Sequence, residues 1–486
     1  MVKKARNIRK VLIANRGEIA LRILRTVKEL GMGAIAVYEK PDSEAYYIRA
    51  ADEAILIGDG PRRDYLDVEK IIWAAHKGDA DAIHPGYGFL SENPDLSAEC
   101  ERAGLIFVGP PPHVIRNLGN KVMAREIAKK AKCPSIAGTE DLAQGEEGIE
   151  QSIAFGKQHG YPLMLKASAG GGGRGIRKIQ NREELIEQLP MARSEALSAF
   201  GNDNVYIEKM IENPRHVEIQ ILADQHGHIF HLGSRDCSIQ RRHQKILEIA
   251  PADLPAVVLN AMYKCAIETA KAAGYINAGT VEFLVDPKTH NFWFMEMNTR
   301  LQVEHTVTEE LTGVDIVRAQ IRIAEGYPLN IPKERVRLLG KAIQVRINAE
   351  DPKNNFMPEG GKQVEVYRSP GGLGVRLDGA VYQGYTIPTD YDSLMVKMTI
   401  RGYNWEQTLQ RLKRSLNDFL IVGPKTTIPF YRAICEEHDF KAGKFDTSYI
   451  ETHPEIFAYS EEEREVAKLS RLIAEIHAKK TNPYAY

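Results

Sequence analysis

The chain has 486 residues, which is too long for one hydrophobic core and predicts two to four structural units. Its formal net charge of −1 excludes a strong electrostatic attraction to nucleic acid or to an anionic membrane, and no apolar run reaches the roughly 18 residues of a membrane span. The five cysteines form no C-x-x-C pair. We therefore expect a reducing, cytoplasmic location, and neither a zinc site nor a disulfide framework.

Residues 1–118 alternate short apolar strands with helical segments. A strand from Val11 to Ala14 is followed by apolar residues at helical spacing up to Leu30, and Gly31 is expected to end that helix. The stretches "GAIAVY", "DAIH" and "LIFVGP" continue the alternation as further strands. This order predicts a doubly wound, Rossmann-like α/β domain.

From about residue 119 the pattern becomes α+β. A helix is expected to begin near Asn120, and "NVYIEKMI", "RHVEIQILAD" and "HIFHLGSRDCSIQ" are typical of strands. The stretch "SEEEREVAKLSRLIAEIHAKK" predicts an amphipathic helix, which docks on its own domain or contacts another subunit. The expected domains are 1–118, 119–335, 336–450 and a helical tail, 451–486.

The stretch "KASAGGGGRGIR", residues 166–177, places four consecutive glycines after a buried-strand sequence, which argues against a flexible linker. It satisfies G-x-G-x-x-G, but "IRKI" then predicts a strand where a dinucleotide fold has a helix. Ile176 and Arg177 stand where a Walker A loop has Lys and Ser/Thr. We expect a mobile hairpin whose backbone N–H groups close over phosphates beside Lys166; a plain tight turn is the alternative.

Two glutamates stand on the arms of a predicted hairpin in "GTVEFLVDPKTHNFWFMEMNTR". If residues whose numbers sum to 578 pair across a loop at 287–291, Glu282 faces Glu296. Opposed carboxylates repel each other unless a cation lies between them, and Mg²⁺ takes such oxygen ligands. Asn298, on the same face, offers another oxygen. A solvated strand face is the alternative.

Further charged residues surround this hairpin. In "TRLQVEH", Arg300, Gln302 and Glu304 alternate and would point to one side of an extended segment, as an ion pair or as an anion site with a base. The stretch "CSIQRRHQK" is a basic surface loop or a second anion pocket. In "IQVRINAE", Arg346 stands on an apolar strand and therefore needs an anionic or carbonyl partner.

These motifs together resemble biotin carboxylase, the ATP-grasp component of biotin-dependent carboxylases. The resemblance rests on "HPGYGFLSEN", "KASAGGGGRGIR", "ENPRHVEIQ", "SRDCSIQRRHQK", "MEMNTRLQVEH", "TGVD" and "INAEDP", and runs from about residue 8 to about 450. It implies a Rossmann-like pre-ATP-grasp domain, an ATP-grasp domain with a mobile lid at about 136–202, and a mixed α/β C-terminal domain. It is closest to stand-alone subunits of acetyl-CoA, pyruvate or related 2-oxo acid carboxylases.

The resemblance also implies a role for each matching residue. ATP phosphates would be held by Lys121, Lys166, Gly172 and Gly173. The rest of the nucleotide pocket would comprise Glu208, Lys209, Met210, Ile211, His216, Gln240 and His243. Two Mg²⁺ or Mn²⁺ ions would be held by Glu282, Glu296 and Asn298. Bicarbonate would be held by Lys245, Arg300, Gln302 and the backbone of Val303. Glu304 would be its base, and Arg346 would face the ureido oxygen of biotin.

The implied reaction is ATP-dependent carboxylation of biotin at N1′ through carboxyphosphate. No Met-Lys biotinylation dipeptide occurs in the sequence, so the biotin is expected on a separate carrier protein or a biotinylated carboxyltransferase subunit. A homodimer is expected, with no nucleic-acid or membrane partner. The alternatives are another ATP-grasp ligase, such as a carbamoyl-phosphate or purine-pathway enzyme, and a catalytically silent scaffold. The final acceptor stays open among acetyl-CoA, pyruvate, 2-oxoglutarate and other acyl-CoA substrates.

Overall fold

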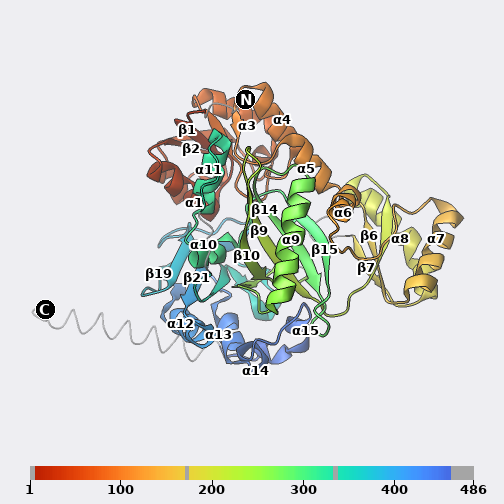
Figure 1. Cartoon of the computed structure of the whole chain (residues 1–486). Helices are drawn as coiled ribbons and strands as arrows, with labels where there is room; N and C mark the ends of the chain where they lie inside the picture. Colours follow the sequence, from red (N-terminus) through yellow and green to blue (C-terminus); the bar gives the residue numbers. More distant parts are fainter. Residues whose placement is uncertain (1–5, 170–174, 243, 332–337, 461–486) are drawn as a thin grey trace, which may run out of the picture.

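The computed structural model describes residues 6–169, 175–242, 244–331 and 338–460. Its N-terminal unit, at the top of Figure 1, contains a parallel sheet of strand order β3-β2-β1-β4-β5. The strands are β1 (Lys10–Ile13), β2 (Gly33–Glu39), β3 (Glu53–Gly58), β4 (Ala82–His84) and β5 (Ile106–Phe107). The helices are α1 (Gly17–Glu29), α2 (Tyr46–Ala50), α3 (Val68–Lys77), α4 (Pro94–Arg102) and α5 (Pro112–Gly119).

Helices cover both faces of this sheet because successive side chains of β1 point in opposite directions. Val11 is buried in one apolar cluster together with Leu24 of α1. Leu12 is buried in a second cluster, on the other face, together with Ile71 of α3. The predicted doubly wound α/β unit is confirmed.

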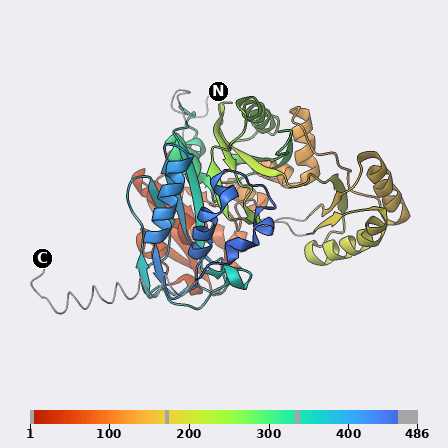
Figure 2. The same cartoon turned by 90° about the horizontal axis from the view of Figure 1, so that it is seen from below.

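A small lobe follows and stands to one side of the molecule in both views (Figure 1, Figure 2). Its elements are α7 (Gly145–His159), β6 (Leu163–Ala167), β7 (Ile176–Ile179), α8 (Arg182–Phe200) and β8 (Val205–Lys209). The strands form an antiparallel sheet of order β7-β6-β8, with Lys166 paired to Ile176. The predicted strands on either side of the glycine run are therefore confirmed, and they pair with each other. Residues 170–174 themselves lie outside the described part of the chain.

The largest sheet is antiparallel, with strand order β15-β14-β9-β10-β13-β16-β21-β20. Its strands are β9 (Arg215–Ala223), β10 (Ile229–Asp236), β13 (Leu247–Ala250), β14 (Asn277–Val285), β15 (Phe292–Asn298), β16 (Lys341–Asn348), β20 (Val375–Gly379) and β21 (Leu394–Gly402). Because β13 pairs with β16, the sheet continues across the expected domain limit at residue 335. The central and C-terminal segments thus share one framework.

The remaining elements pack around this sheet. The helices are α6 (Lys121–Lys130), α9 (Ala256–Ala272), α10 (His305–Thr312), α11 (Ile316–Glu325), α12 (Trp405–Asp418), α13 (Ile428–Glu436), α14 (His438–Lys441) and α15 (Tyr449–Thr452). The short strands are β11 (Gln240–Arg241), β12 (Gln244–Lys245), β17 (Glu350–Asp351), β18 (Met357–Pro358), β19 (Val366–Arg368) and β22 (Leu420–Val422). A helix begins next to Asn120, as predicted. The Asn120 side chain caps α6 by accepting hydrogen bonds from the N–H groups of Val122 and Met123. Most of the predicted tail helix, residues 461–486, lies outside the described residues.

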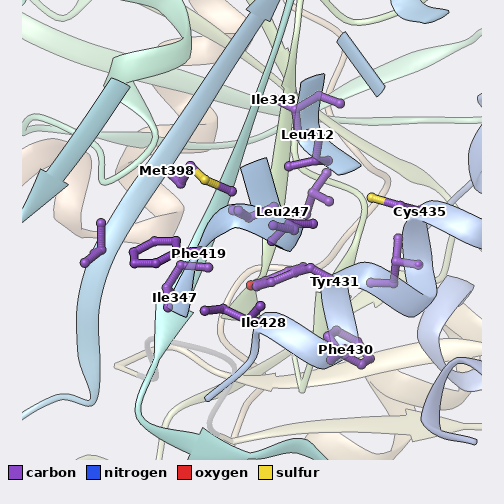
Figure 3. Packing of buried hydrophobic residues seen from close by; sticks show 14 of the residues in the cluster. Leu247, Ile343, Ile347, Met398, Leu412, Phe419, Ile428, Phe430, Tyr431 and Cys435 are labelled. Carbon is purple, nitrogen blue, oxygen red and sulfur yellow. The ribbon is translucent and has the colours of Figure 1, made fainter. Parts of the chain in front are cut away.

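The C-terminal half of the large sheet has two unlike faces. On one face Leu247, Ile343 and Met398 pack against Leu412 of α12 and Phe430 of α13 (Figure 3). Alternate residues of the same strands point to the other face, where α10 packs. That face is buried yet polar, with Glu248, Gln344, Lys397 and Thr399, and the polar surface continues onto β9, β10 and β14 with Glu218, Arg235 and Glu282. A buried polar surface needs internal partners, and these partners make up the site described below.

One cysteine prediction is wrong. Cys133 and Cys265 form a disulfide, with Cα atoms 5.2 Å apart and 132 residues apart in sequence. Cys133 follows α6 and Cys265 lies in α9, and these two helices pack against each other. Such a pairing depends on tertiary packing and leaves no spacing pattern in the sequence.

Among the described residues, no helix is long and apolar enough to cross a membrane.

Candidate active site

The predicted pairing of two glutamates in the β14–β15 hairpin is confirmed. Glu282 lies directly opposite Glu296. The register then shifts by one residue, so that Phe283 pairs with Phe294 and Met295 is the extra residue of a β-bulge. The predicted pairing, in which the numbers of paired residues sum to 578, is thus correct at the two carboxylates and wrong from Phe283 toward the turn.

Lys245 lies at the centre of a cluster of three glutamates. Its Nζ donates to Oε2 of Glu218 at 2.6 Å, to Oε1 of Glu282 at 2.8 Å and to Oε1 of Glu304 at 2.8 Å. Burial alone would lower the pKa of Lys245, but the three carboxylates raise it well above its usual range. Burial raises the pKa of Glu218 in spite of the neighbouring cations. Lys245 therefore stays charged and holds three carboxylates together.

Glu304 and Arg346 meet at the end of this cluster. Arg346 Nη2 donates to Oε2 of Glu304 at 3.1 Å, and its Nε donates to Oε1 of Glu248 at 2.9 Å. Burial alone would raise the pKa of Glu304, but Lys245 and Arg346 bring it well below its usual range. Glu304 is thus an ionised carboxylate at neutral pH. The anionic partner that the sequence demanded for Arg346 is supplied by the fold.

Arg300 and Gln302 do not lie on a strand, contrary to the prediction of an extended segment. Residues 299–304 form a bend and turn that lead into α10. The segment turns because its carbonyls and side chains bond inward: Arg300 Nη1 donates to Gln302 Oε1 at 2.9 Å, and Gln302 Nε2 donates to Glu282 Oε1 at 3.2 Å. Arg300 Nε also donates to Glu92 Oε2 at 2.8 Å, which joins it to the N-terminal unit. The turn nevertheless gathers these side chains beside Lys245.

Three predicted metal ligands lie together. Glu282 accepts hydrogen bonds from Asn298 Nδ2 at 2.8 Å and from Lys245, and its Oε2 is 2.8 Å from His216 Nε2. Burial alone would raise the pKa of Glu282, but Lys245 and His216 lower it. No described side chain donates to Glu296, whose pKa is raised by burial and by Glu282. Glu282 and Glu296 thus form a pair of carboxylates in which Glu296 has no hydrogen-bond donor among the described side chains. Such a pair is suited to bind a hard divalent cation.

The predicted phosphate and nucleotide residues line the junction between α6 and the lobe. Lys166 on β6 donates to Oε2 of Glu208, whose Oε1 accepts from Arg125 Nη1 at 3.2 Å. Burial lowers the pKa of Lys121, although Glu296 and Glu208 oppose this effect. Lys121, Lys166 and Glu296 are thus electrostatic neighbours, as a site for a charged phosphate chain requires.

The other nucleotide residues are less concentrated. Gln240 Nε2 contacts His216 Nδ1 at 2.6 Å, close to the carboxylate pair. Lys209 points elsewhere, because its Nζ donates to the carbonyls of Gly160 and Tyr161 in the lobe, each at 3.3 Å. Met210 and Ile211 follow β8 where the chain leaves the lobe. Gly172, Gly173 and His243 lie outside the described residues.

Sequence reasoning missed Glu92, Glu218 and Glu248, which accept hydrogen bonds from Arg300, Lys245 and Arg346. It also missed Arg235, which donates to Glu218. A signal was present for one of them: in "RHVEIQILAD", His216, Glu218 and Gln220 alternate with apolar residues on one strand. Arg235 is fully buried and donates to Glu218 and to Gln220, the latter at 2.8 Å.

Three protein-family models match consecutive parts of the chain. The N-terminal domain of biotin carboxylase matches residues 7–115, and the C-terminal domain of biotin carboxylase matches residues 344–452. Between them, the ATP-binding domain of the carbamoyl-phosphate synthase L chain matches residues 120–332. Biotin carboxylase 1 of Bacillus subtilis is 48% identical over 448 residues, which cover 92% of this chain and 99% of that protein. The chain belongs to the biotin carboxylase family.

Two further relatives come from carboxylases of 2-oxo acids. The biotin carboxylase domain of Hydrogenobacter thermophilus 2-oxoglutarate carboxylase, a dimer in complex with MgADP, ADP and bicarbonate, has a TM-score of 0.89 and 46% identity, over 93% of this chain and 99% of that one. Pyruvate carboxylase of Bacillus subtilis is 47% identical over 97% of this chain, which spans 41% of that longer protein.

These similarities confirm the predicted family, the three-part fold and the enzyme class. This biotin carboxylase is an ATP-dependent ligase, the biotin carboxylase component of a biotin-dependent carboxylase.

Proposed function

We propose that this biotin carboxylase uses ATP to activate bicarbonate and then carboxylates N1′ of biotin carried by a separate protein. The observation that carries the proposal is the cluster in which Lys245 and Arg346 both contact Glu304. In this cluster the buried carboxylate of Glu304 can act as a base. The cations on either side of it can bind an anion, such as bicarbonate, and stabilise charge on an oxygen, such as the ureido oxygen of biotin.

Bicarbonate would occupy the space beside the turn, against Lys245, Arg300, Gln302 and the Val303 N–H. Glu304 would accept its proton. A carboxylate with so low a pKa is a weak base, so proton transfer requires that the second negative charge on bicarbonate be stabilised as it develops. Lys245 and Arg300 supply that stabilisation, because both are partly buried cations with donors facing the turn.

The deprotonated oxygen would then attack the γ-phosphorus of ATP, and ADP leaves as the P–O bond to it breaks. Lys121 and Lys166 would offset the charge on the phosphates. Glu282, Glu296 and Asn298 would hold the divalent cations, which spread the phosphate charge when bound. The lobe, with Gly172 and Gly173, would close over the nucleotide and exclude water from carboxyphosphate.

Carboxyphosphate would break its C–O bond to give CO₂ and phosphate. Phosphate would take the N1′ proton of biotin, and the nitrogen would attack the carbon of CO₂. Arg346 would stabilise the negative charge that develops on the ureido oxygen, exchanging its bond to Glu304 for one to biotin while Glu248 keeps its other side in place. The backbone of residues Glu208, Lys209, Met210 and Ile211 and the side chains of His216, Gln240 and His243 would hold the adenosine part.

The partners follow from the same proposal. The biotin would reside on a biotin carboxyl carrier protein or a biotinylated carboxyltransferase subunit. The similarity to pyruvate and 2-oxoglutarate carboxylases supports a 2-oxo acid as the final acceptor. The dimeric relative supports a homodimer, and we propose a cytoplasmic location.

The test is ATP hydrolysis measured with and without bicarbonate, and with and without free biotin. We expect hydrolysis that requires bicarbonate and is accelerated by biotin. The matched control is E304Q, which keeps the size of the side chain and removes the base; it should lose the bicarbonate-dependent rate. A folded wild-type protein without biotin stimulation would contradict the proposal.

A further inference from the structure

Two buried side chains hold the backbone of the turn that precedes α10. Lys397 Nζ donates to the carbonyl oxygen of Val303 at 3.0 Å. His305 Nδ1 lies 2.7 Å from the carbonyl oxygen of Gln302. The Gln302 carbonyl shares a peptide unit with the Val303 N–H. The Val303 carbonyl shares the next peptide unit with the Glu304 N–H. The orientation of both peptide planes is therefore set by side chains outside the turn.

His305 must donate from Nδ1, because a carbonyl oxygen only accepts. Its Nε2 has no hydrogen-bond partner among the described residues. Burial, together with the cations Lys397 and Arg22, lowers the pKa of His305 well below its usual range. His305 is thus a neutral ring with a fixed tautomer, and Lys397 is the charged member of the pair of supports.

Lys397 joins three parts of the chain at one point. It lies on β21 between two cross-strand neighbours, Arg346 on β16 and Asp378 on β20. Its Nζ is 3.1 Å from Oε1 of Glu18, in the first turn of α1, and 5.5 Å from the ring centroid of Tyr87. Both Lys397 and Glu18 are buried, at 0% and 4% exposure.

Stability alone is a weak explanation for this arrangement. A buried ion pair commonly contributes little more than well-packed apolar residues of the same size. Neither oxygen of Glu18 receives a well-directed hydrogen bond from the described residues. The hydrogen bond from Lys397 that is well formed goes instead to Val303, in the turn that bears Gln302 and Glu304.

We infer that Lys397 is a positioning residue for bicarbonate: by holding the Val303 carbonyl, it fixes the Gln302–Glu304 turn in the geometry that bicarbonate binding needs, and Glu18 balances its charge. This inference rests on the proposed function, which assigns bicarbonate to that turn. Lys397 itself does not touch the substrate, since its ammonium faces the carbonyl side of the turn.

The test compares wild type with K397M, E18Q and E18Q/K397M. K397M keeps the length of the side chain but leaves Glu18 buried without a cation, so it is expected to lose stability. The double variant removes both charges and is expected to restore the melting temperature. E18Q alone keeps the donor to Val303, and so is the matched control. For each variant, KM for bicarbonate, KM for ATP and kcat are measured in the bicarbonate-dependent hydrolysis assay.

We expect E18Q/K397M to raise KM for bicarbonate about tenfold or more, because small displacements of groups in a binding site have effects of this size. KM for ATP should stay within about twofold of wild type. E18Q should keep KM for bicarbonate within about twofold. A folded double variant with wild-type KM for bicarbonate would overturn the inference, as would equal rises in both KM values. If wild type itself lacks bicarbonate-dependent hydrolysis, the proposed function fails first, and the inference falls with it.

Discussion

Replacing Glu248 by Gln tests how the fold prepares Arg346 for biotin. Glu248 is fully buried, and its Oε1 accepts two hydrogen bonds from Arg346, one of them from Nε at 2.9 Å. Its Oε2 accepts from Gln344 Nε2 at 2.9 Å. Gln344 can invert its amide to meet Gln at position 248, because Thr306 beside it has a hydroxyl that can donate or accept. E248Q should therefore fold.

The expected loss follows from the two bonds to Arg346. Above about pH 7, where Glu248 is ionised, each of its two bonds to Arg346 joins two charged groups. E248Q leaves only one charged partner in each bond, which costs about 1 kcal/mol per bond, or about 2 kcal/mol and roughly 30-fold in rate. Arg346 is then drawn toward Glu304, its other carboxylate partner. E248Q should lose this factor in the biotin-stimulated rate of ATP hydrolysis, and less than about threefold in the bicarbonate-dependent rate without biotin. Equal losses in both assays, or no loss with biotin, would refute the reasoning.

The same variant has a pH signature. Burial raises the pKa of Glu248 to about 7, from an ordinary value of 4.5, against the attraction of Arg346. The folded protein therefore binds more protons than the unfolded chain between these pH values. The stability that Glu248 contributes is complete below about pH 4.5 and is lost as pH rises through about 7. In E248Q the free energy of unfolding should depend less on pH across this window, measured by urea titration at several pH values.

Three further predictions concern neighbouring residues. R346A should lower the biotin-stimulated rate about a hundredfold while KM for ATP stays within about twofold, because Arg346 bonds to Glu248 and Glu304 whereas Lys166 bonds to Glu208. Parallel changes in the biotin-stimulated rate and in KM for ATP would count against the assignment. E296Q should raise the melting temperature in EDTA, because it relieves the repulsion between Glu296 and Glu282. It should also lose the rise in melting temperature that Mg²⁺ gives to wild type, measured by calorimetry. Unchanged stabilisation by Mg²⁺ would argue against a metal site at Glu296. E92Q should raise KM for bicarbonate severalfold, since Arg300 loses a charge-assisted bond, and an unchanged value would show that Arg300 is held without Glu92.

The sequence pattern predicts those features of the fold that depend on neighbouring residues. The pairing of Glu282 with Glu296 follows from loop length and strand alternation, because hairpin register is a local property. The bulge at Met295 breaks that register, and no residue type near it signals an inserted position. The start of α6 next to Asn120 is equally local.

The partners of the site residues were not predictable in the same way. Glu248 meets Arg346 across 98 residues of sequence, and Glu92 meets Arg300 across 208. Each acid by itself looks like an ordinary polar residue in its segment. The pairing of β13 with β16 brings Glu248 to Arg346, and the contact between the N-terminal unit and the turn before α10 brings Glu92 to Arg300. The prediction of an extended segment from Arg300 to Glu304 failed for a related reason, because the hydrogen bonds from Arg300 to Glu92 and from Gln302 to Glu282 override the local alternation.

The central claim is that an oxygen of bicarbonate attacks the γ-phosphorus of ATP in this site. It is tested by supplying bicarbonate labelled with ¹⁸O and analysing the phosphate product by mass spectrometry. Because the bridging oxygen of carboxyphosphate stays with phosphorus when CO₂ leaves, we expect one labelled oxygen in phosphate for each ADP formed. R346A should still transfer the label, although it carboxylates biotin poorly. Phosphate released without label, at a rate that depends on bicarbonate, would contradict the account.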